Sequence, residues 1–404
     1  MTGKAEISSG PVVVPVVVPV VPPVILAAGG TGGHMFPAEA LARELLARGQ
    51  RVVLVTDRRG KAFGDALPEV EVHRIRASSF GSGIVGKIRG VIELCLGAIQ
   101  ARRLIARLHP SAVVGFGGYP SVPTVLMAQR AGVPTVLHEQ NAVLGRANRL
   151  AAPGAVRIAT SFASVAAVKP GDAGKLVFTG NPVRPNVTAV RNLPYPALEG
   201  GGEVHLLVVG GSQGARIFSE IVPEALSLLP EALKRRIRIA QQCRPEDIEA
   251  AKAAFTKAGI MAELSTFFRD VPERLAACHL AVCRSGASTV AELAAVGRPA
   301  ILVPYPYAMD DHQTANAQAV ADAGAAWLMP QTAFSPQALA DRLVALLDLA
   351  HTLTKAAEAA HARGGADAAS RLADTVLGVA NGASSTQSDR PRAGADHYST
   401  EAAE

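Results

Sequence analysis

Two stretches of this chain share one pattern, in which a short apolar run leads into a glycine-rich turn and then into a helical segment. Residues 24–28 precede the turn Gly29-Gly30-Thr31-Gly32-Gly33, and residues 205–209 precede the turn Gly210-Gly211-Ser212-Gln213-Gly214. Apolar runs alternate with amphipathic segments after each turn, which is typical of βαβ units and a parallel sheet. The sequence therefore predicts an α/β protein with two Rossmann-like, doubly wound domains. Such domains leave a cleft at the carboxyl ends of their strands, where ligands bind.

Strands are predicted at 24–28, 51–55, 70–75, 112–115, 135–138, 157–160, 176–179, 205–209, 237–241, 281–283 and 300–303. Helices are predicted at 37–48, 218–229, 245–258, 289–296 and 314–323, and residues 338–377 are expected to be mainly helical. The Pro/Gly-rich segment 182–202 is the candidate linker. We divide the chain into an extended, disordered Pro/Val arm (1–22), two domains (23–190 and 191–380) and a disordered tail (381–404).

The uncharged run 11–28 resembles a signal peptide or a membrane span only in its hydropathy. Five prolines interrupt it, and one proline inside a helix costs about 3 kcal/mol. We therefore interpret the repeated PVVV unit as an extended arm that ends in the first buried strand. No later stretch reaches the roughly 18 apolar residues of a spanning helix, so no span is predicted.

Composition excludes several other classes of protein. The four cysteines form no CxxC pair, which argues against a zinc ribbon or a disulfide scaffold and fits a reducing cytoplasm. A net charge of +6 permits attraction to anionic lipid or phosphate. Aromatic residues make up only 4%, which leaves little material for stacking nucleic-acid bases, and no nucleic-acid partner is predicted.

The first glycine turn ends at His34 and predicts an anion site, because glycines let main-chain N–H groups approach a ligand at a helix start. A dinucleotide fingerprint is disfavoured, since Met35 stands where the third glycine belongs and Asp57 lies 27 residues after Gly30 rather than about 20. An ordinary histidine pKa near 6.5 suits a general base, so His34 is a candidate catalytic residue. The alternative is a histidine with a purely structural hydrogen bond.

Two further polar segments follow strands of the first domain. They are 115–121, which includes Tyr119, and the consecutive polar residues 138–141. Four polar side chains at the end of a strand suit a cleft that bonds hydroxyl-rich ligands, although an edge strand that enters a solvated loop would look similar. Arg184, at the end of the first half, could pair with a phosphate or cap a helix.

The second half offers a helix start at 284–292. Its serines and threonine are typical of N-caps, and the exposed N–H groups of such a start would stabilise a diphosphate. Glu292 could accept hydrogen bonds from a ribose diol, or it could form a capping box with Thr289. In the later loop, His312, Gln313 and Asn316 could bond sugar hydroxyls or belong to a solvated helix cap. Asp310 and Asp311 suggest a metal, but no second cluster supports one, and no metal or cofactor is predicted.

The motifs GGTGGH, GGYPS, HEQNAVLGRAN, GNPVR, GGSQGA, CRSGASTVAEL and DHQTANA occur in this order over about 300 residues. This ordered set resembles the MurG family of bacterial peptidoglycan glycosyltransferases. The resemblance implies the GT-B fold and inverting transfer of N-acetylglucosamine from UDP-N-acetylglucosamine to the 4-hydroxyl of N-acetylmuramic acid in lipid I, which yields lipid II. It also implies a peripheral enzyme at the cytoplasmic face of the inner membrane, with an acceptor and membrane domain followed by a donor domain whose last helices pack back on the first.

By the same resemblance, the donor contacts fall on matching positions of this chain. They are the loop residues Thr31, Gly32 and Gly33, the sugar contacts Asn141 and Gln313, the diphosphate contacts Arg184 and Ser212, the main-chain cradle Ala287, Ser288 and Thr289, the ribose carboxylate Glu292, and Phe268 at the uracil position. The family often has isoleucine where Phe268 stands, which is harmless if the main chain makes the contact. Residues His34, Tyr119 and Glu139 match the acceptor cleft, with His34 the first and Glu139 the second choice of base.

A basic amphipathic stretch predicts contact with an anionic membrane. It comprises Phe80, Ile84, Val85, Ile88 and Ile92 together with Lys87 and Arg89. An ordinary core helix would give a similar pattern. Three rival functions also stay open at this point, namely a UDP-N-acetylglucosamine 2-epimerase, a lipid glucosyltransferase that acts on diacylglycerol, and a non-catalytic nucleotide-sugar binder.

Overall fold

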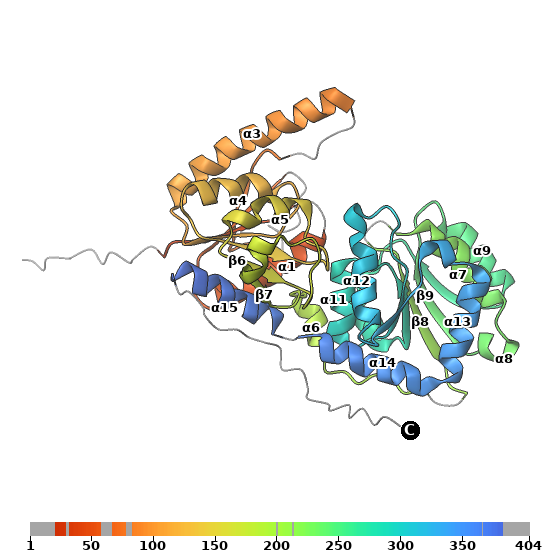
Figure 1. Cartoon of the computed structure of the whole chain (residues 1–404). Coiled ribbons are helices and arrows are strands. Elements are labelled where there is room, and N and C mark those ends of the chain that lie inside the picture. The colour runs from red at the N-terminus through yellow and green to blue at the C-terminus, as the bar shows by residue number, and fades with distance from the viewer. Residues whose placement is uncertain are drawn as a thin grey trace, which may run out of the picture.

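The computed structural model describes residues 21–29, 32–57, 67–77, 83–198, 201–211, 214–365 and 367–382; of residues 83–89 and 350 it describes the backbone alone. These residues form two α/β lobes that lie side by side (Figure 1). Each lobe has one parallel sheet with helices packed against it, which confirms the predicted pair of Rossmann-like domains.

The first sheet has the strand order β3-β2-β1-β4-β5-β6-β7. Its strands are β1 (Val24–Ala27), β2 (Val52–Thr56), β3 (Glu71–Arg74), β4 (Ala112–Gly115), β5 (Thr135–Glu139), β6 (Arg157–Thr160) and β7 (Leu176–Phe178). Every residue of β1, β2, β4 and β5 is buried, as expected for strands covered on both faces. The apolar runs of the sequence therefore lie at the centre of this sheet.

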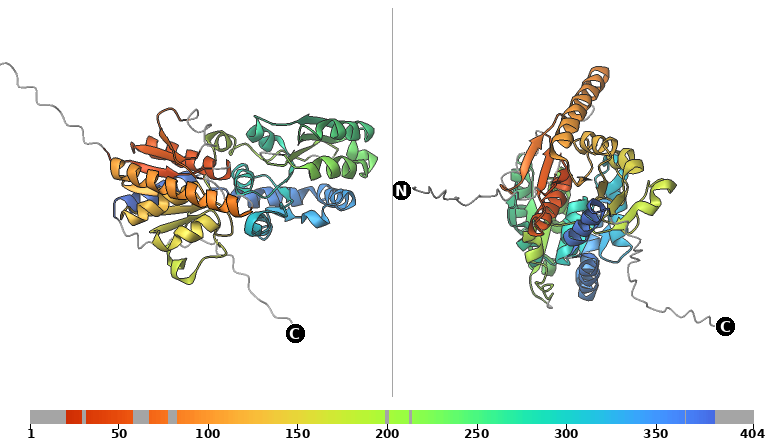
Figure 2. Two further views of the ribbon diagram at one scale, coloured as in Figure 1. Left: turned by 90° about the horizontal axis from the view of Figure 1, so that it is seen from above. Right: turned by 90° about the vertical axis from the view of Figure 1, so that its left-hand side faces the viewer.

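Helices pack around this sheet. They are α1 (Gly32–Ala47), α3 (Gly83–Leu108), α4 (Ser121–Arg130) and α5 (Arg146–Ala151), whereas the short helix α6 (Pro185–Ala189) packs on α11 (Ala287–Val296) of the second lobe. Helix α3 packs on α4 and projects beyond the lobe (Figures 1 and 2). Phe80 of the predicted membrane stretch, and the side chains of its residues 84–89, lie outside the described residues, whereas Ile92 is half exposed.

The second sheet repeats the same strand order as β10-β9-β8-β11-β12-β13. Its strands are β8 (Val204–Val209), β9 (Ile237–Gln242), β10 (Met261–Ser265), β11 (Leu280–Cys283), β12 (Ala300–Leu302) and β13 (Ala326–Leu328). Its helices are α7 (Arg216–Ser227), α8 (Glu231–Lys234), α9 (Ile248–Lys257), α10 (Val271–Ala277), α11 (Ala287–Val296), α12 (His312–Ala321) and α13 (Pro336–Asp348). The two edge strands β10 and β13 were not predicted: β10 is not a continuous apolar run, and β13 has only three residues.

The last two described helices of the chain connect the two lobes. Helix α14 (Ala350–Arg363) packs on α11 and α13 of the second lobe. Helix α15 (Ala368–Ala380) crosses back to the first lobe, where Leu372 and Val376 enter the same core as Val24 and Leu26 (Figure 1). None of the helices in the described part of the chain is both long and apolar enough to cross a membrane.

Candidate active site

A pocket of about 270 Å³ lies between the two lobes, at the carboxyl ends of β4 and β5. Residues of both lobes line it, among them His34, Gly117, Gly118, Tyr119, Glu139, Gln140, Asn141, Asn148, Met309, Asp310 and His312. Three predicted acceptor residues, His34, Tyr119 and Glu139, are thus brought together with His312 of the second lobe. The pocket is the cleft expected where strands of two doubly wound sheets end.

The imidazole of His34 sits in the first turn of α1, against the turn Gly117-Gly118. Both glycines have positive φ, and a Cβ at Gly118 would lie 3.3 Å from His34 Cδ2, so glycine leaves room for the ring. His34 Nδ1 is 3.0 Å from Oε1 of Gln140. The ring is therefore held on one side while its other nitrogen stays at the pocket.

The polar segment 138–141 uses most of its hydrogen bonds inside the protein. The His138 ring is fully buried, with Nε2 3.3 Å from the carbonyl of Gly180 and Nδ1 2.9 Å from Gln140 Nε2. Burial lowers the pKa of His138 to about 4. The expectation that all four side chains would line the cleft was thus wrong for His138, whereas Glu139, Gln140 and Asn141 do line the pocket, with Gln140 bonded to His34 and His138.

Glu139 is also buried, and both of its oxygens accept hydrogen bonds. Oε1 accepts from the main-chain N and from Nδ2 of Asn141, at 3.0 and 3.2 Å. Oε2 accepts from the Gly145 N–H and from Nδ2 of Asn148, both at 2.8 Å. Four donors around one carboxylate fix the loop that forms one wall of the pocket.

Side chains of the second lobe reach across the cleft. The buried Asn316 donates to Asn141 Oδ1 at 3.1 Å and to the Ser285 carbonyl at 3.0 Å, and its Oδ1 accepts from the Ala142 N–H at 2.8 Å. All three polar contacts of this amide are with protein, and two of them join the lobes. Its role in reading a sugar stays a prediction.

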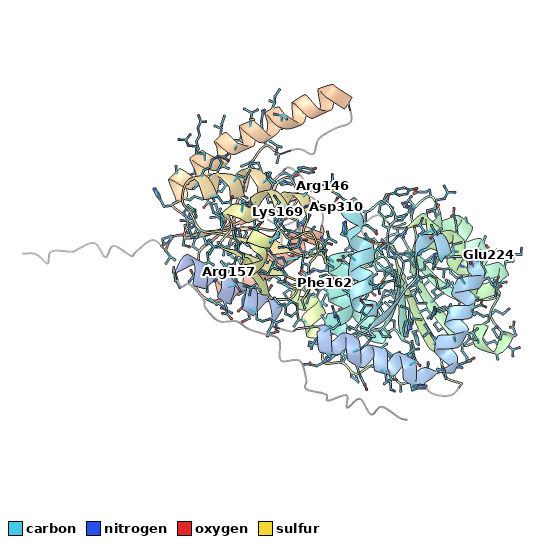
Figure 3. All side chains as sticks on the ribbon, viewed as in Figure 1. Arg146, Arg157, Phe162, Lys169, Glu224 and Asp310 are labelled. Carbon is cyan, nitrogen blue, oxygen red and sulfur yellow. The ribbon has the colours of Figure 1, made fainter. Side chains whose placement is uncertain are left out.

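An ion-pair cluster closes the rim of the pocket, where Figure 3 labels Arg146 beside Asp310. Arg146 lies 2.9 Å from the Asp310 carboxylate, and Arg149 also pairs with it. The hydrogen bonds from Arg146, with the charge of Arg149, hold the pKa of Asp310 below its usual range. The described residues contain no group of three His, Cys, Asp or Glu side chains that could hold a metal ion.

The start of helix α11 presents main chain rather than side chains. Gly286 is its N-cap, and no side chain caps it. The alternative capping box of Thr289 with Glu292 is absent, because Glu292 instead pairs with Arg184 at 3.0 Å. Burial raises the pKa of Glu292, and the charge of Arg184 opposes that rise.

Three buried polar atoms near this helix start have no hydrogen-bond partner among the described residues. They are Ser288 Oγ, Arg184 Nε and Asn181 Oδ1. The Arg184 guanidinium also stacks 4.5 Å from the centre of the Phe36 ring. Buried polar groups without partners are uncommon, and here they gather beside an uncapped helix start, as a site for a polar ligand requires.

The remaining predicted residues fall into three groups. Gln313 and His312 bond main chain in the loop before α12, at Tyr305 N (3.0 Å) and the Met309 carbonyl (2.7 Å). Phe268 is buried under Arg274, whose guanidinium lies 4.2 Å from the ring centre. Gly32 and Gly33 begin α1, whereas Thr31 and Ser212 lie outside the described residues.

Sequence reasoning missed Asn148 and the two arginines of the ion-pair cluster. All three belong to the HEQNAVLGRAN motif or directly follow it. The motif was therefore the available signal for these residues. The shared partner of Arg146 and Arg149, Asp310, lies about 160 residues away in the chain.

Family comparisons match both lobes. Residues 24–160 match the N-terminal domain of glycosyltransferase family 28, and residues 205–372 match its C-terminal domain. A protein of Rhodospirillum centenum is 60% identical over 88% of this chain and 94% of its own length. One of Rhodospirillum rubrum is 56% identical over 88% and 92%. Both are named UDP-N-acetylglucosamine–N-acetylmuramyl-(pentapeptide) pyrophosphoryl-undecaprenol N-acetylglucosamine transferase.

Solved structures agree on the fold. The crystal structure of MurG from Acinetobacter baumannii superposes with a TM-score of 0.71 at 30% identity, and covers 88% of this chain and 99% of its own. A UDP-N-acetylglucosamine 2-epimerase from Neisseria meningitidis has a TM-score of 0.60 at 14% identity, over 88% of this chain and 99% of its own. The second likeness concerns the fold alone.

Proposed function

The chain belongs to the MurG family of transferases within glycosyltransferase family 28, and from this premise we propose how its cleft performs the reaction. The enzyme transfers N-acetylglucosamine from UDP-N-acetylglucosamine to the 4-hydroxyl of N-acetylmuramic acid in lipid I, and releases lipid II and UDP. The observation that carries this assignment is the high identity over nearly the whole length with enzymes of that name. The 2-epimerase alternative has only a distant likeness of fold in its favour.

The nucleotide sugar binds at the second lobe, with its diphosphate at the start of α11. Uncapped N–H groups of Ala287, Ser288 and Thr289 and the positive end of the helix dipole suit a diphosphate, and suit it more as charge develops on the leaving UDP. Arg184 Nε and Ser288 Oγ have no hydrogen-bond partner in the described part of the chain, which supports their use by the donor. Glu292 binds the ribose diol, Gln313 the sugar, and the main chain at Phe268 the uracil.

The acceptor alcohol enters the pocket beside His34. Nε2 of His34 takes the proton as the O4–H bond breaks, the oxygen forms a bond to the anomeric carbon, and the bond from that carbon to the diphosphate oxygen breaks with its electrons leaving on UDP. Attack opposite the leaving group inverts the anomeric configuration. Glu139 holds the loop 140–148 rather than the proton, because both of its oxygens already accept two hydrogen bonds.

Labelled UDP-N-acetylglucosamine tests the assignment, incubated with and without a lipid I analogue. Labelled disaccharide should form only when the acceptor is present, and UDP-glucose should be a poor donor. Epimerised nucleotide sugar without acceptor would indicate the isomerase instead. Donor binding without turnover in either arm would indicate a non-catalytic binder.

The enzyme meets its lipid acceptor as a peripheral protein on the anionic, cytoplasmic face of the inner membrane, through α3. Supporting this, Val91, Ile92 and Ile99 of α3 are each about half exposed, on a helix that projects from the first lobe (Figures 1 and 2). Arg102 and Arg103 are exposed farther along the same helix. Exposed apolar residues beside cations are typical of helices that lie in a membrane interface.

Vesicle sedimentation tests this contact with phosphatidylglycerol vesicles, and with phosphatidylcholine vesicles as the neutral control. The variant Ile92→Asp should bind phosphatidylglycerol vesicles several-fold more weakly, as should charge reversal at Lys87 and Arg89. Arg235→Glu, at an exposed site after α8 of the second lobe, also lowers the net charge and is the control, which should bind as the wild type does. Unchanged binding of both α3 variants would contradict this role of the helix.

A further inference from the structure

A continuous series of hydrogen bonds runs from the main chain after β7 to the imidazole of His34. It passes from the Gly180 carbonyl to His138 Nε2 (3.3 Å), from His138 Nδ1 to Gln140 Nε2 (2.9 Å), and from Gln140 Oε1 to His34 Nδ1 (3.0 Å). His34 is held in helix α1, and the side chains of His138 and Gln140 are buried. We call this series the relay.

Only one arrangement of protons satisfies every bond of the relay. A carbonyl oxygen can only accept, so His138 Nε2 carries the proton and its Nδ1 is a bare acceptor. Nε2 of Gln140 donates to that nitrogen and also to the His138 carbonyl at 3.0 Å, which uses both amide hydrogens. The reversed amide would place an oxygen against two acceptors, so Oε1 of Gln140 faces His34.

The proton of neutral His34 is then on Nδ1, because Gln140 Oε1 accepts and cannot donate. Its Nε2 keeps a lone pair, and within the described part of the chain no protein group bonds this nitrogen. The nitrogen lies beside the Gly117-Gly118 turn at the pocket.

The far end of the relay is rigid. The His138 ring is fully buried and tilts against Phe116, with ring centres 5.5 Å apart. Its low pKa, caused by burial, keeps it neutral at physiological pH, so its Nδ1 stays an acceptor. Arg371 of α15 donates to the Thr179 carbonyl at 3.1 Å, and thereby holds the segment that carries the Gly180 carbonyl.

We propose that Gln140 and His138 are positioning residues, which fix His34 as the Nδ1–H tautomer so that Nε2 faces the acceptor alcohol as the base. The proposal rests on the proposed role of His34. Neither residue touches substrate in this scheme. In a neutral histidine, the hydrogen bond that one ring nitrogen makes decides which nitrogen carries the proton and which stays basic. Here His34 Nδ1 bonds the Gln140 amide, and His138 fixes the orientation of that amide.

Nitrogen-15 NMR of the full chain measures the tautomer directly. Histidine-labelled wild type is recorded at about pH 8.5, where an ordinary imidazole is neutral, and the His34 signals are assigned by their loss in His34→Gln. We expect a protonated Nδ1 and an unprotonated Nε2. A proton on Nε2 in the wild type would overturn the proposal without any need of a variant in the relay.

Substitution then tests the role of Gln140. Gln140→Met keeps the length of the side chain and removes both links, so His34 should lose its Nδ1–H preference. The kcat of Gln140→Met should fall roughly 10- to 100-fold. Removal of the base itself is expected to lower kcat more, by about 10²–10⁴-fold. Gln140→Glu retains an acceptor for His34 Nδ1–H and should keep the tautomer, but its second oxygen would face the two acceptors of His138, so this variant should also be less stable.

Gln129→Met is the matched control. Gln129 is a partly buried glutamine of the same lobe, which donates to Thr135 Oγ1 at 3.2 Å and to the Ala151 carbonyl at 2.8 Å. It should change neither the His34 signals nor kcat. An unchanged tautomer and kcat in Gln140→Met would contradict the proposal.

The role of His34 as the base and the role of the relay are tested separately. If His34→Ala keeps its activity, His34 is not the base, although the NMR signals can still report the relay. If His34→Ala is inactive but the wild-type proton is on Nε2, His34 is still supported as the base, and the relay does not fix its tautomer as proposed.

Discussion

The two lobes have the same order of parallel strands but present different chemistry to the cleft. In the first lobe the strand ends carry polar side chains, and His34, His138, Glu139 and Gln140 are bonded into a fixed arrangement. In the second lobe the start of α11 offers an uncapped main chain. The same fold thus presents polar side chains to the cleft in one lobe and main-chain N–H groups in the other.

The difference fits the two tasks that we propose for the lobes. A base must hold one nitrogen lone pair at one place, which requires a side chain whose ring and tautomer are fixed by neighbours. A departing diphosphate spreads its charge over several oxygens, and several N–H groups with a helix dipole suit it without any particular side chain. Substitution of side chains should therefore be severe in the first lobe and mild at the start of α11.

The largest effect is expected at His34. His34→Ala should lower kcat about 10²–10⁴-fold, because a positioned base contributes about that much. Circular dichroism melting should show little change in stability, since the ring lies at the pocket and is only partly buried. His351→Ala, at an exposed site on α14, is the control. Retention of more than half of wild-type turnover would remove His34 as the base.

Glu139→Gln should mainly lower stability. The new amide would place two hydrogens against N–H donors that now point at a carboxylate, and the free energy of unfolding should fall by about 3–4 kcal/mol in urea titrations. Glu220→Gln, on an exposed pair with Arg216, should change it by less than about 1 kcal/mol. A large loss of kcat at unchanged stability would instead favour Glu139 as the base.

His138 should make stability depend on pH. Its pKa is about 4 in the folded protein and about 6.5 when unfolded, so between these values the unfolded chain binds more protons. The stability that His138 contributes is complete above about pH 6.5 and is lost as the pH falls toward 4, by up to about 3 kcal/mol. His138→Phe should be less stable overall but should show a smaller fall over this range. The matched variant His351→Phe should keep the wild-type slope.

The smallest effect is expected at Thr289. Thr289→Ala leaves the main-chain N–H groups of α11 in place, so the KM for UDP-N-acetylglucosamine should change by less than about threefold, below the roughly 1 kcal/mol of a side-chain hydrogen bond. Steady-state kinetics with varied donor measures it. A tenfold rise in KM would show that the donor depends on the Thr289 side chain as well as on the main chain at the start of α11, and the contrast between the lobes would be lost.

Most strands were predictable because their information is local. The apolar run 112–115 coincides with β4, since residues buried on both faces of a parallel sheet are mostly apolar. Strand β10 was missed because it lies at a sheet edge, where Met261 and Glu263 are exposed and no apolar run arises. The position of an edge is a property of the assembled sheet.

The sequence by itself determined which residues could do chemistry, because glycine turns and polar segments after strands are visible along the chain. Only the tertiary structure decided how those residues are used. Gln140 could have faced a ligand, but its Oε1 meets His34 of α1, 106 residues away in the chain, only once the sheet is assembled. Asn316 likewise joins the lobes through Asn141, 175 residues away in the chain. A hydrogen bond needs two groups within about 3 Å at a given angle, and for residues far apart in sequence only the packed fold sets that distance.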